Sequence, residues 1–166
     1  MTSKATTIRL AITELGLPPI VLQIFDTKRM SGPYQSKFGY PRVLLLSDEE
    51  EWGAWGCPSM VPLWDDGNAG VIVAHCPAGG MQGFFRFELE GKVMPPVGMG
   101  WQQVLVGEFK RLWLQETPAE EIQEIARAFE FKHLAQLTKE LNQINTYRAS
   151  ALDPWYQDFV RRVGPV

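Results

Sequence analysis

Hydrophobic residues recur every three or four positions at the start of the chain, a spacing typical of an amphipathic helix. We expect this helix over residues 4–16, because Gly16 suits the position just past a helix end and a Pro-Pro pair follows at Pro18-Pro19. The apolar face consists of Ile8, Ala11, Ile12 and Leu15. Residues 26–42 are rich in Gly, Pro, Ser and Tyr, which predicts an irregular loop.

A leucine-rich run and an acidic segment come next. Residues 42–46, RVLLL, form a short apolar run with turn formers before it, which favours a buried strand. Ser47 and Glu50 have the spacing of a capping box, and acidic residues in a first turn suit the helix dipole. We therefore expect a short helix over residues 48–55.

The middle of the chain shows the two-residue period of β-strands. In residues 83–90, GFFRFELE, apolar and charged residues alternate, so one face of this strand should be packed and the other wetter. MVPLW (60–64) and VIVAHC (71–76) are also strand-like, and the links DDGNAG and PAGGMQG are dense in turn formers. Strands joined by such short links predict an antiparallel meander.

The last third of the chain is predicted to be helical. An apolar stripe runs through residues 101–115. Thr117-Pro118-Ala119-Glu120 then combines an N-cap, a proline at the first helical position and a glutamate three residues after the cap, which indicates a helix start. The segment that follows is long, so we expect a break near Phe131–His133, and Asp153-Pro154 should open a final short helix.

These elements predict one α+β domain over residues 1–166, in which helices pack on a central, mostly antiparallel sheet. The core is expected over about residues 10–115 and a helical C-terminal extension over about 116–166. The longest apolar runs are VLLL and VIVA, far shorter than the roughly 20 residues of a membrane span, and the start of the chain shows no signal-peptide pattern. No membrane partner is expected.

Composition narrows the class of partner and the compartment. The formal net charge of −3 and the pI of 5.4 do not fit the basic footprint of a nucleic-acid binder, so no nucleic acid is expected. Cys57 and Cys76 are the only cysteines. Two buried thiols are the default for a cytoplasmic protein, and a disulfide is the less common alternative. We expect the cytoplasm.

Few residues suggest chemistry. Cys57, Cys76, His75 and His133 could be drawn into a metal site or a Cys–His nucleophile pair, but they lack the close pairs of zinc sites, and strand alternation separates His75 from Cys76. Asp-Asp-Gly-Asn is also near-ideal turn chemistry. We therefore expect no catalytic residue, no metal and no cofactor. A small enzyme or metalloprotein using those four residues remains an alternative.

One feature of the chain suggests binding rather than catalysis. Acidic residues and tryptophans interleave between positions 48 and 66, and they could form one surface. Tryptophan is enriched at binding hot spots, and acidic patches steer basic partners. The candidate partner-binding residues are Asp48, Glu49, Glu50, Glu51, Trp52, Trp55, Trp64, Asp65 and Asp66. The alternative is that the tryptophans belong to the core and the acids are simply solvated.

The order of these segments resembles the SUKH superfamily, which includes the Smi–Knr cell-wall-assembly regulators and many bacterial toxin-immunity proteins. The segments that carry the resemblance are RVLLLSDEEEW (42–52), SMVPLWDDGNAGVIVAHC (59–76), GFFRFELEGKV (83–93) and WQQVLVGEFKRLWL (101–114). They match a leucine-rich strand and acidic helix, an apolar-Pro-apolar strand, a D-G-x-G-like turn, a strand pair and an F-x-x-F-L type helix. Ser31-Gly32 stands where that pattern has Asn-Gly.

The resemblance implies an α+β domain that is not an enzyme and acts by binding a specific protein, with a cognate toxin as one alternative and a regulatory scaffold as another. It covers about residues 10–115. A further alternative is a structural subunit that oligomerises through the helices of residues 117–163. The sequence leaves the oligomeric state and the partner's identity open.

Overall fold

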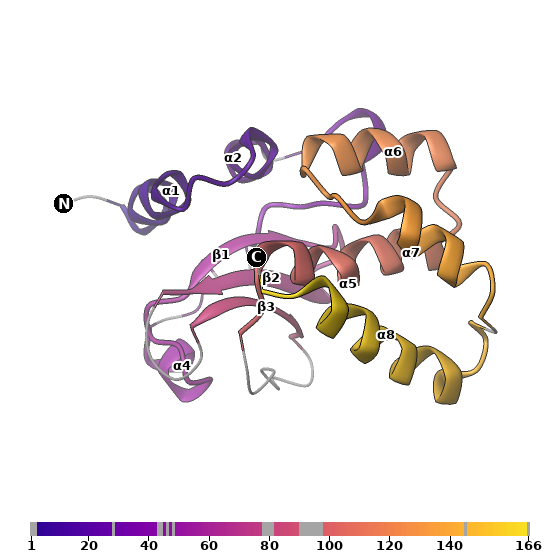
Figure 1. Ribbon diagram of the computed structural model, residues 1–166. Helices are drawn as coiled ribbons and strands as arrows, with labels where there is room; N and C mark the ends of the chain where they lie inside the picture. Colours follow the sequence, from indigo (N-terminus) through magenta and orange to yellow (C-terminus); the bar gives the residue numbers. More distant parts are fainter. Residues whose placement is uncertain are drawn as a thin grey trace. The chain divides into compact units, whose positions relative to one another are not determined.

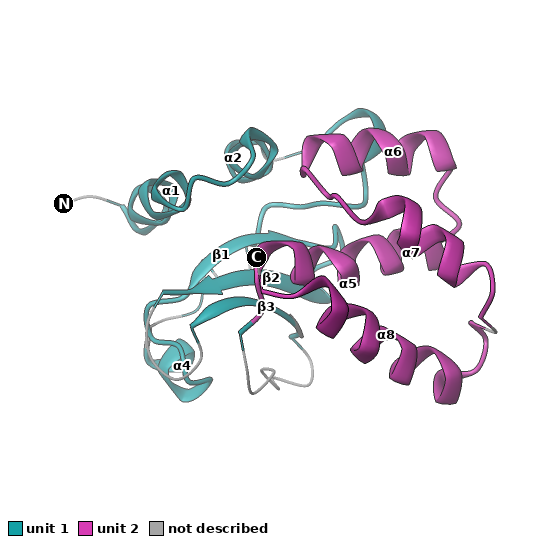
Figure 2. Ribbon diagram, in the orientation of Figure 1, with its two compact units in different colours: residues 1–98 teal, residues 99–166 magenta. Residues whose placement is uncertain are grey.

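The computed structural model describes residues 3–27, 29–42, 45, 47, 49–77, 82–89, 98–144 and 146–165, with only the backbone of Glu49 and Phe87. The chain forms two compact units, Met1–Gly98 and Met99–Val166 (Figures 1 and 2). The predicted α+β class is confirmed, because unit 1 contains an antiparallel sheet with helices and the C-terminal part is helical. Each unit is described by itself below.

The sheet of unit 1 is the predicted antiparallel meander. Its strands β1 (Val61–Asp65), β2 (Val71–Cys76) and β3 (Gly83–Glu88) lie in the order β1-β2-β3. β2 and β3 pair without interruption from Val71 opposite Glu88 to Cys76 opposite Gly83. The β1–β2 register shifts between Pro62 and Trp64, which fits proline, since it has no N–H to donate to a ladder.

Two N-terminal helices contribute to the core of unit 1. α1 (Lys4–Glu14) agrees with the predicted helix, and the Ser3 hydroxyl caps it by accepting from the Thr6 N–H at 3.2 Å. α2 (Pro19–Asp26) starts with proline at its first position, where the missing N–H costs nothing. Both helices contact β1. Their buried side chains are Ile8, Ile12, Ile20, Val21, Ile24 and Phe25.

The loop and the short helix ahead of β1 agree in part with the sequence. The irregular loop includes a 3₁₀ turn, η1 (Gly32–Tyr34), and the acidic helix is α4 (Glu49–Ala54). The predicted strand over residues 42–46 is wrong at Arg42 and Leu45, which are helical, and the Leu45 N–H donates to the Pro41 carbonyl at 3.2 Å. The other three residues of that prediction lie outside the described residues.

In the described residues of unit 2, three helices pack around a fourth, α5. These are α5 (Trp101–Leu114), α6 (Ala119–Ala128), α7 (Leu134–Leu141) and α8 (Ala149–Val163), and α5 contacts each of the others. The rings of Phe109 and Phe131 stack with centroids 4.5 Å apart. The fully buried side chains of this core include Leu105, Phe109, Leu112, Phe129 and Phe159.

Of the two helix boundaries predicted for unit 2, one is confirmed and one is wrong. The break near Phe131–His133 is confirmed, because α6 ends at Ala128 and α7 starts at Leu134. The predicted start of the last helix at Asp153-Pro154 is wrong: α8 begins at Ala149 and Pro154 lies inside it. Burial of Leu152 extends the helix ahead of the proline, which shows packing prevailing over local preference.

The unit boundary differs from the expected division near residue 116. α5 belongs to the same compact unit as the helices that follow it, because its buried face packs against α6, α7 and α8. Among the helices that the structure describes, none is long and apolar enough to cross a membrane. Whether the two units act as one domain stays a prediction.

Candidate functional site

The Asp-Asp-Gly-Asn segment forms the tight turn that the sequence indicated. Asp65 Oδ1 accepts from the Gly67 N–H at 2.8 Å, and Asp66 Oδ1 accepts from the N–H groups of Asn68 and Gly70, both at 3.1 Å. The Asp66 N–H closes the hairpin by donating to the Val71 carbonyl at 3.0 Å. Both carboxylates therefore hold backbone donors of the β1–β2 turn, as expected for Asp in turns.

The predicted acidic and tryptophan surface is only partly exposed. Trp52 is 3% exposed and Trp64 is fully buried, so neither indole forms part of an exposed surface, and Asp65 is 6% exposed. These three residues follow the alternative of core and turn, because an indole contributes most by being buried. Glu50 is exposed, whereas Glu51, Trp55 and Asp66 are half-buried. A partner-binding role for those four stays a prediction.

Two residues of that predicted surface cannot be placed. Asp48 lies outside the described residues, and of Glu49 only the backbone is described. The structure does bring α4 and the β1–β2 turn into the same unit. α4 leads to Cys57, which is bonded to Cys76 at the opposite end of β2 from this turn, so a surface shared by Glu50 and Asp66 stays a prediction.

The expectation of two free buried thiols is wrong. Cys57 and Cys76 are both buried, at 0% and 1% exposure, but they are joined as a disulfide with a Cα–Cα distance of 6.0 Å. The bond connects the segment after α4 to the end of β2. Neither sulfur is a thiolate in this state, so neither can act as a nucleophile or a metal ligand.

The two histidines lie in different units and in different surroundings. The ring of His75 on β2 lies tilted by 55° against the ring of Phe84, with 4.9 Å between centroids. Burial lowers the pKa of its imidazole from the ordinary value because burial disfavours the charged form. His133 precedes α7, close to the ring of Phe131. Within the described residues no three His, Cys, Asp or Glu side chains gather as metal ligands would.

Unit 2 contains a groove lined by residues of α5, α6 and α7. It encloses about 1250 Å³ and is bounded by the end of α5, by α6, by α7 and by the residues after α7. Two of the large apolar side chains that are exposed, Leu114 at 39% and Tyr147 at 96%, lie on it. Its remaining apolar lining consists of Trp113, Ala119, Ile122, Leu134 and Ala135.

The charged residues that line this groove are one acid and one base, and the acidic residues of α6 are not among its lining residues. α6 carries Glu120, Glu121 and Glu124 against a single arginine, Arg127. Glu116 lies on the groove, and Lys139 is the basic residue among its lining side chains.

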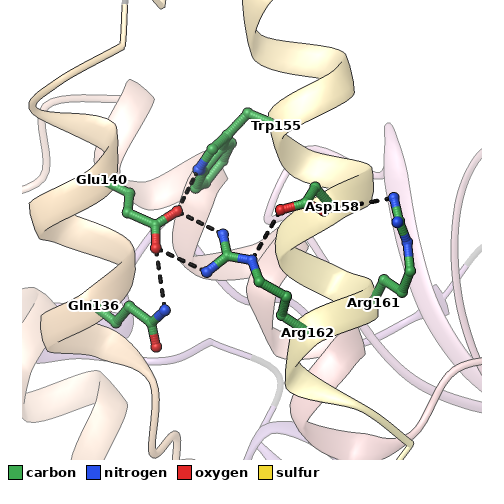
Figure 3. A network of polar contacts seen from close by, with 6 residues as sticks. All are labelled: Gln136, Glu140, Trp155, Asp158, Arg161 and Arg162. Atoms are coloured by element: carbon green, nitrogen blue, oxygen red, sulfur yellow. Dashed lines mark hydrogen bonds and ion pairs between the residues drawn. The ribbon is translucent and has the colours of Figure 1, made fainter.

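A polar network holds α7, one wall of the groove, against α8 (Figure 3). Glu140 accepts two hydrogen bonds from the Arg162 guanidinium, at 3.0 and 2.7 Å, one from the Trp155 Nε1–H at 2.8 Å and one from Gln136 at 3.1 Å. Arg162 also contacts Asp158 at 2.9 Å. The Arg162 hydrogen bonds are the main reason that the pKa of Glu140 falls from 4.5 to about 2.

The residue pattern along the chain does not predict this groove, although it contains one sign of it. The apolar stripe of residues 101–115 places Trp113 on the packed face, and Leu114 follows directly, on a side of the helix that the stripe does not need. A leucine off the stripe marks an exposed apolar residue, but only the packing of α6 and α7 beside it produces a groove.

Comparisons with known proteins add no relative. No family model matches the chain. No curated protein matches it, and neither does any solved structure.

Proposed function

We propose that this protein is a non-catalytic, protein-binding domain that receives an amphipathic helix of its partner in the groove of unit 2. The observation that supports this proposal most is the exposure of Leu114 and Tyr147 on a groove of about 1250 Å³. Apolar grooves between helices are a recurring way to bind an amphipathic helix through side chains spaced three or four residues apart.

The acidic residues of α6 and Glu116 favour a partner helix with basic edges. A helix with an apolar face would replace water at Leu114 and Tyr147, while lysine or arginine at its edges would approach Glu120 and Glu124, which are exposed on α6. Charge complementarity of this kind accelerates association and selects the partner. The partner is thus proposed to be a specific protein with a basic amphipathic helix.

A pair of matched variants tests this proposal. Leu114→Asp places a charge in the groove, whereas Leu10→Asp alters a side chain of α1 that is 55% exposed and lies outside the groove. A partner isolated from the native host with the wild-type chain would be purified, and its affinity measured by calorimetry. We expect Leu114→Asp to weaken binding by about tenfold or more, as at an interface hot spot, and Leu10→Asp to leave it unchanged.

The competing site on unit 1 is tested in the same assay. Charge reversals at Glu50, to lysine and to arginine, change the exposed acid of the surface predicted from the sequence. Asp66 is left intact because its carboxylate holds the N–H groups of Asn68 and Gly70 in the turn. If those reversals weaken the complex and Leu114→Asp does not, then the binding surface lies on unit 1 and the groove proposal is wrong. If no host protein binds the wild-type chain, the binding function itself is contradicted.

The resemblance to the SUKH superfamily belongs to this proposal, and with it an immunity role towards a cognate toxin or a regulatory role. Identifying the isolated partner separates the two, because an immunity protein would neutralise a toxin that it binds. The alternative of an enzyme or metalloprotein is weakened by the disulfide that joins Cys57 and Cys76. Metal analysis and thiol reactivity of the purified chain test that alternative.

The cytoplasmic location also remains a proposal. A disulfide is more typical of oxidising compartments, so the redox state of the two cysteines in the native host tests this location. Trapping the thiols with an alkylating reagent during lysis of the native host would measure the state of Cys57 and Cys76. Full alkylation of both cysteines would support the cytoplasm, and full protection would contradict it.

A further inference from the structure

A second cavity, of about 700 Å³, lies entirely within unit 1. One wall is α1, another is Trp52 with the residues that follow Cys57, and a third is formed by His75 and Pro77 at the end of β2. This volume is in the range of cavities that hold small molecules. The cavity is independent of the groove proposed above as the protein-binding site.

Two ring nitrogens of residues that line this cavity have no hydrogen-bond partner among the described residues. They are Nε1 of Trp52 and Nδ1 of His75, and both atoms are buried. Buried polar atoms in native proteins are nearly always satisfied, so each exception calls for a missing partner such as a ligand. The indole nitrogen is only a donor, and it therefore requires an acceptor.

A positive charge lies at the same end of the cavity. The Lys4 ammonium is 3.9 Å from the centroid of the Trp52 ring, and Lys4 lines the cavity. Its hydrogen bond to the Ser47 carbonyl uses one of its three donors. A cation and an indole N–H at one place favour an acceptor that carries negative charge.

The rest of the cavity is largely apolar, and the disulfide holds two of its walls. The apolar lining comprises Ile8, Ala11, Leu15, Pro58, Met60 and Val61. Pro58 follows Cys57, and His75 and Pro77 flank Cys76, so the Cys57–Cys76 bond fixes both walls relative to each other. Glu14 lines the cavity ten residues after Lys4 on α1, about 15 Å along the helix axis, so it does not compete for the cationic end.

We infer that this cavity binds a small carboxylic acid with an apolar body, its carboxylate directed to Lys4 and the Trp52 N–H and its apolar part lying against α1. The neutral imidazole of His75 can satisfy its Nδ1 against the same ligand in the tautomer that carries the proton on Nδ1, because a carboxylate accepts hydrogen bonds and does not donate them. This inference does not rest on the proposed protein-binding function, because the two sites share no residue.

Nuclear magnetic resonance of the full chain tests the inference, with sodium phenylacetate as the probe. The six tryptophans give six indole N–H signals, and Trp52→Phe identifies the one that belongs to Trp52. We expect millimolar phenylacetate to shift this signal in a saturable way. The neutral phenylacetamide should bind more weakly, because it lacks the charge that Lys4 recognises.

Matched variants separate recognition of the carboxylate from simple filling of the cavity. Lys4→Gln should weaken phenylacetate binding about tenfold, the loss of a charge-assisted hydrogen bond, and leave phenylacetamide unchanged. Lys132→Gln, in unit 2, should change neither. If Trp52→Phe does not fold, the ring signals of His75 provide the same readout, since His133→Gln leaves His75 as the sole histidine.

Two results would overturn the inference. If neither the Trp52 nor the His75 signal responds to phenylacetate, the cavity does not bind such a ligand. The two buried nitrogens without a hydrogen-bond partner would then only lower the stability of the fold. If both signals respond equally in Lys4→Gln and in the wild type, the site does not recognise a carboxylate.

Discussion

Single residues of unit 1 show how closely the loop before β1 packs on the hairpin turn. Gly39 and Asp65 exchange two backbone hydrogen bonds, of 3.0 and 2.9 Å. A Cβ atom at Gly39 would lie 2.2 Å from Asp65 Oδ1, the oxygen that accepts from the Gly67 N–H. Gly67 has a φ of +83°, and a Cβ atom there would lie 2.8 Å from the backbone of Ser36. These glycines are required by close approach, so the buried Asp65 is a structural residue of the turn.

Gly39→Ala is therefore expected to destabilise the protein by about 1–3 kcal/mol, because the added methyl group displaces the Asp65 carboxylate from a packed site. Gly53→Ala is the matched control. Gly53 lies in α4 with its nearest neighbour 3.8 Å from an added Cβ, so alanine should stabilise by about 0.5–1 kcal/mol. Urea unfolding of both variants measures the difference, and equal effects would contradict the close contact.

Pairs of elements depend on partly exposed polar contacts as well as on apolar burial. In unit 2 the polar network around Glu140 joins α7 to α8, and Leu137, Leu141 and Phe159 on these two helices are buried. Glu140 is 24% exposed and Arg162 41%, so solvent screens the ion pair and its contribution stays modest. The network matters for function because it positions α7, which forms one wall of the proposed binding groove.

Glu140→Gln should cost about 1 kcal/mol at neutral pH, the size of a partly exposed, charge-assisted contact. The folded-state pKa of Glu140 is lowered to about 2, so its stabilising effect is present above its ordinary pKa of 4.5. The effect is lost as the pH falls from about 5 towards 2. Urea unfolding across that range should show the variant and the wild type converging.

The control for this prediction is Glu124→Gln on α6, whose exposed carboxylate should give a difference near zero at every pH. A wild-type advantage that persists at pH 2 would contradict the role of the ionised Glu140.

For the molecule as a whole, the two compact units are stabilised by different means. Unit 1 combines a three-stranded sheet with a disulfide, whereas unit 2 relies on a helical core around Phe109, Phe129 and Phe159. The disulfide closes a loop with a sequence separation of 19 residues. Cross-links of this length act mainly by restricting the unfolded chain, although the mechanism is model-dependent.

Removal of the disulfide by Cys57→Ala with Cys76→Ala should destabilise unit 1 by about 3 kcal/mol. Hydrogen exchange should show faster exchange in residues 57–77 and unchanged protection in α5. A reducing agent should reproduce the effect in the wild type and have none on the double variant. Equal loss of protection in both units would show that they unfold together and would contradict separate stabilisation.

Local sequence signals predicted the elements whose formation depends on near neighbours. The alternation in residues 83–90, the turn chemistry of DDGNAG and the helical periods near both ends correspond to β3, the β1–β2 turn, α1 and α5. Local signals were less reliable where packing prevails. Arg42 and Leu45 are helical despite an apolar run that favours a strand, and α8 begins ahead of Pro154 because Leu152 is buried.

The sequence by itself determined the α+β class, the order of the strands and the turn that joins β1 to β2, because these follow from side-chain period and backbone preference over a few residues. Only the tertiary structure decided that Trp52 and Trp64 are buried, that Cys57 meets Cys76, and where the groove and the cavity lie. The physical reason is that burial, cross-linking and concave surfaces depend on which distant segments pack against each other. Local patterns of residue types do not reveal that packing.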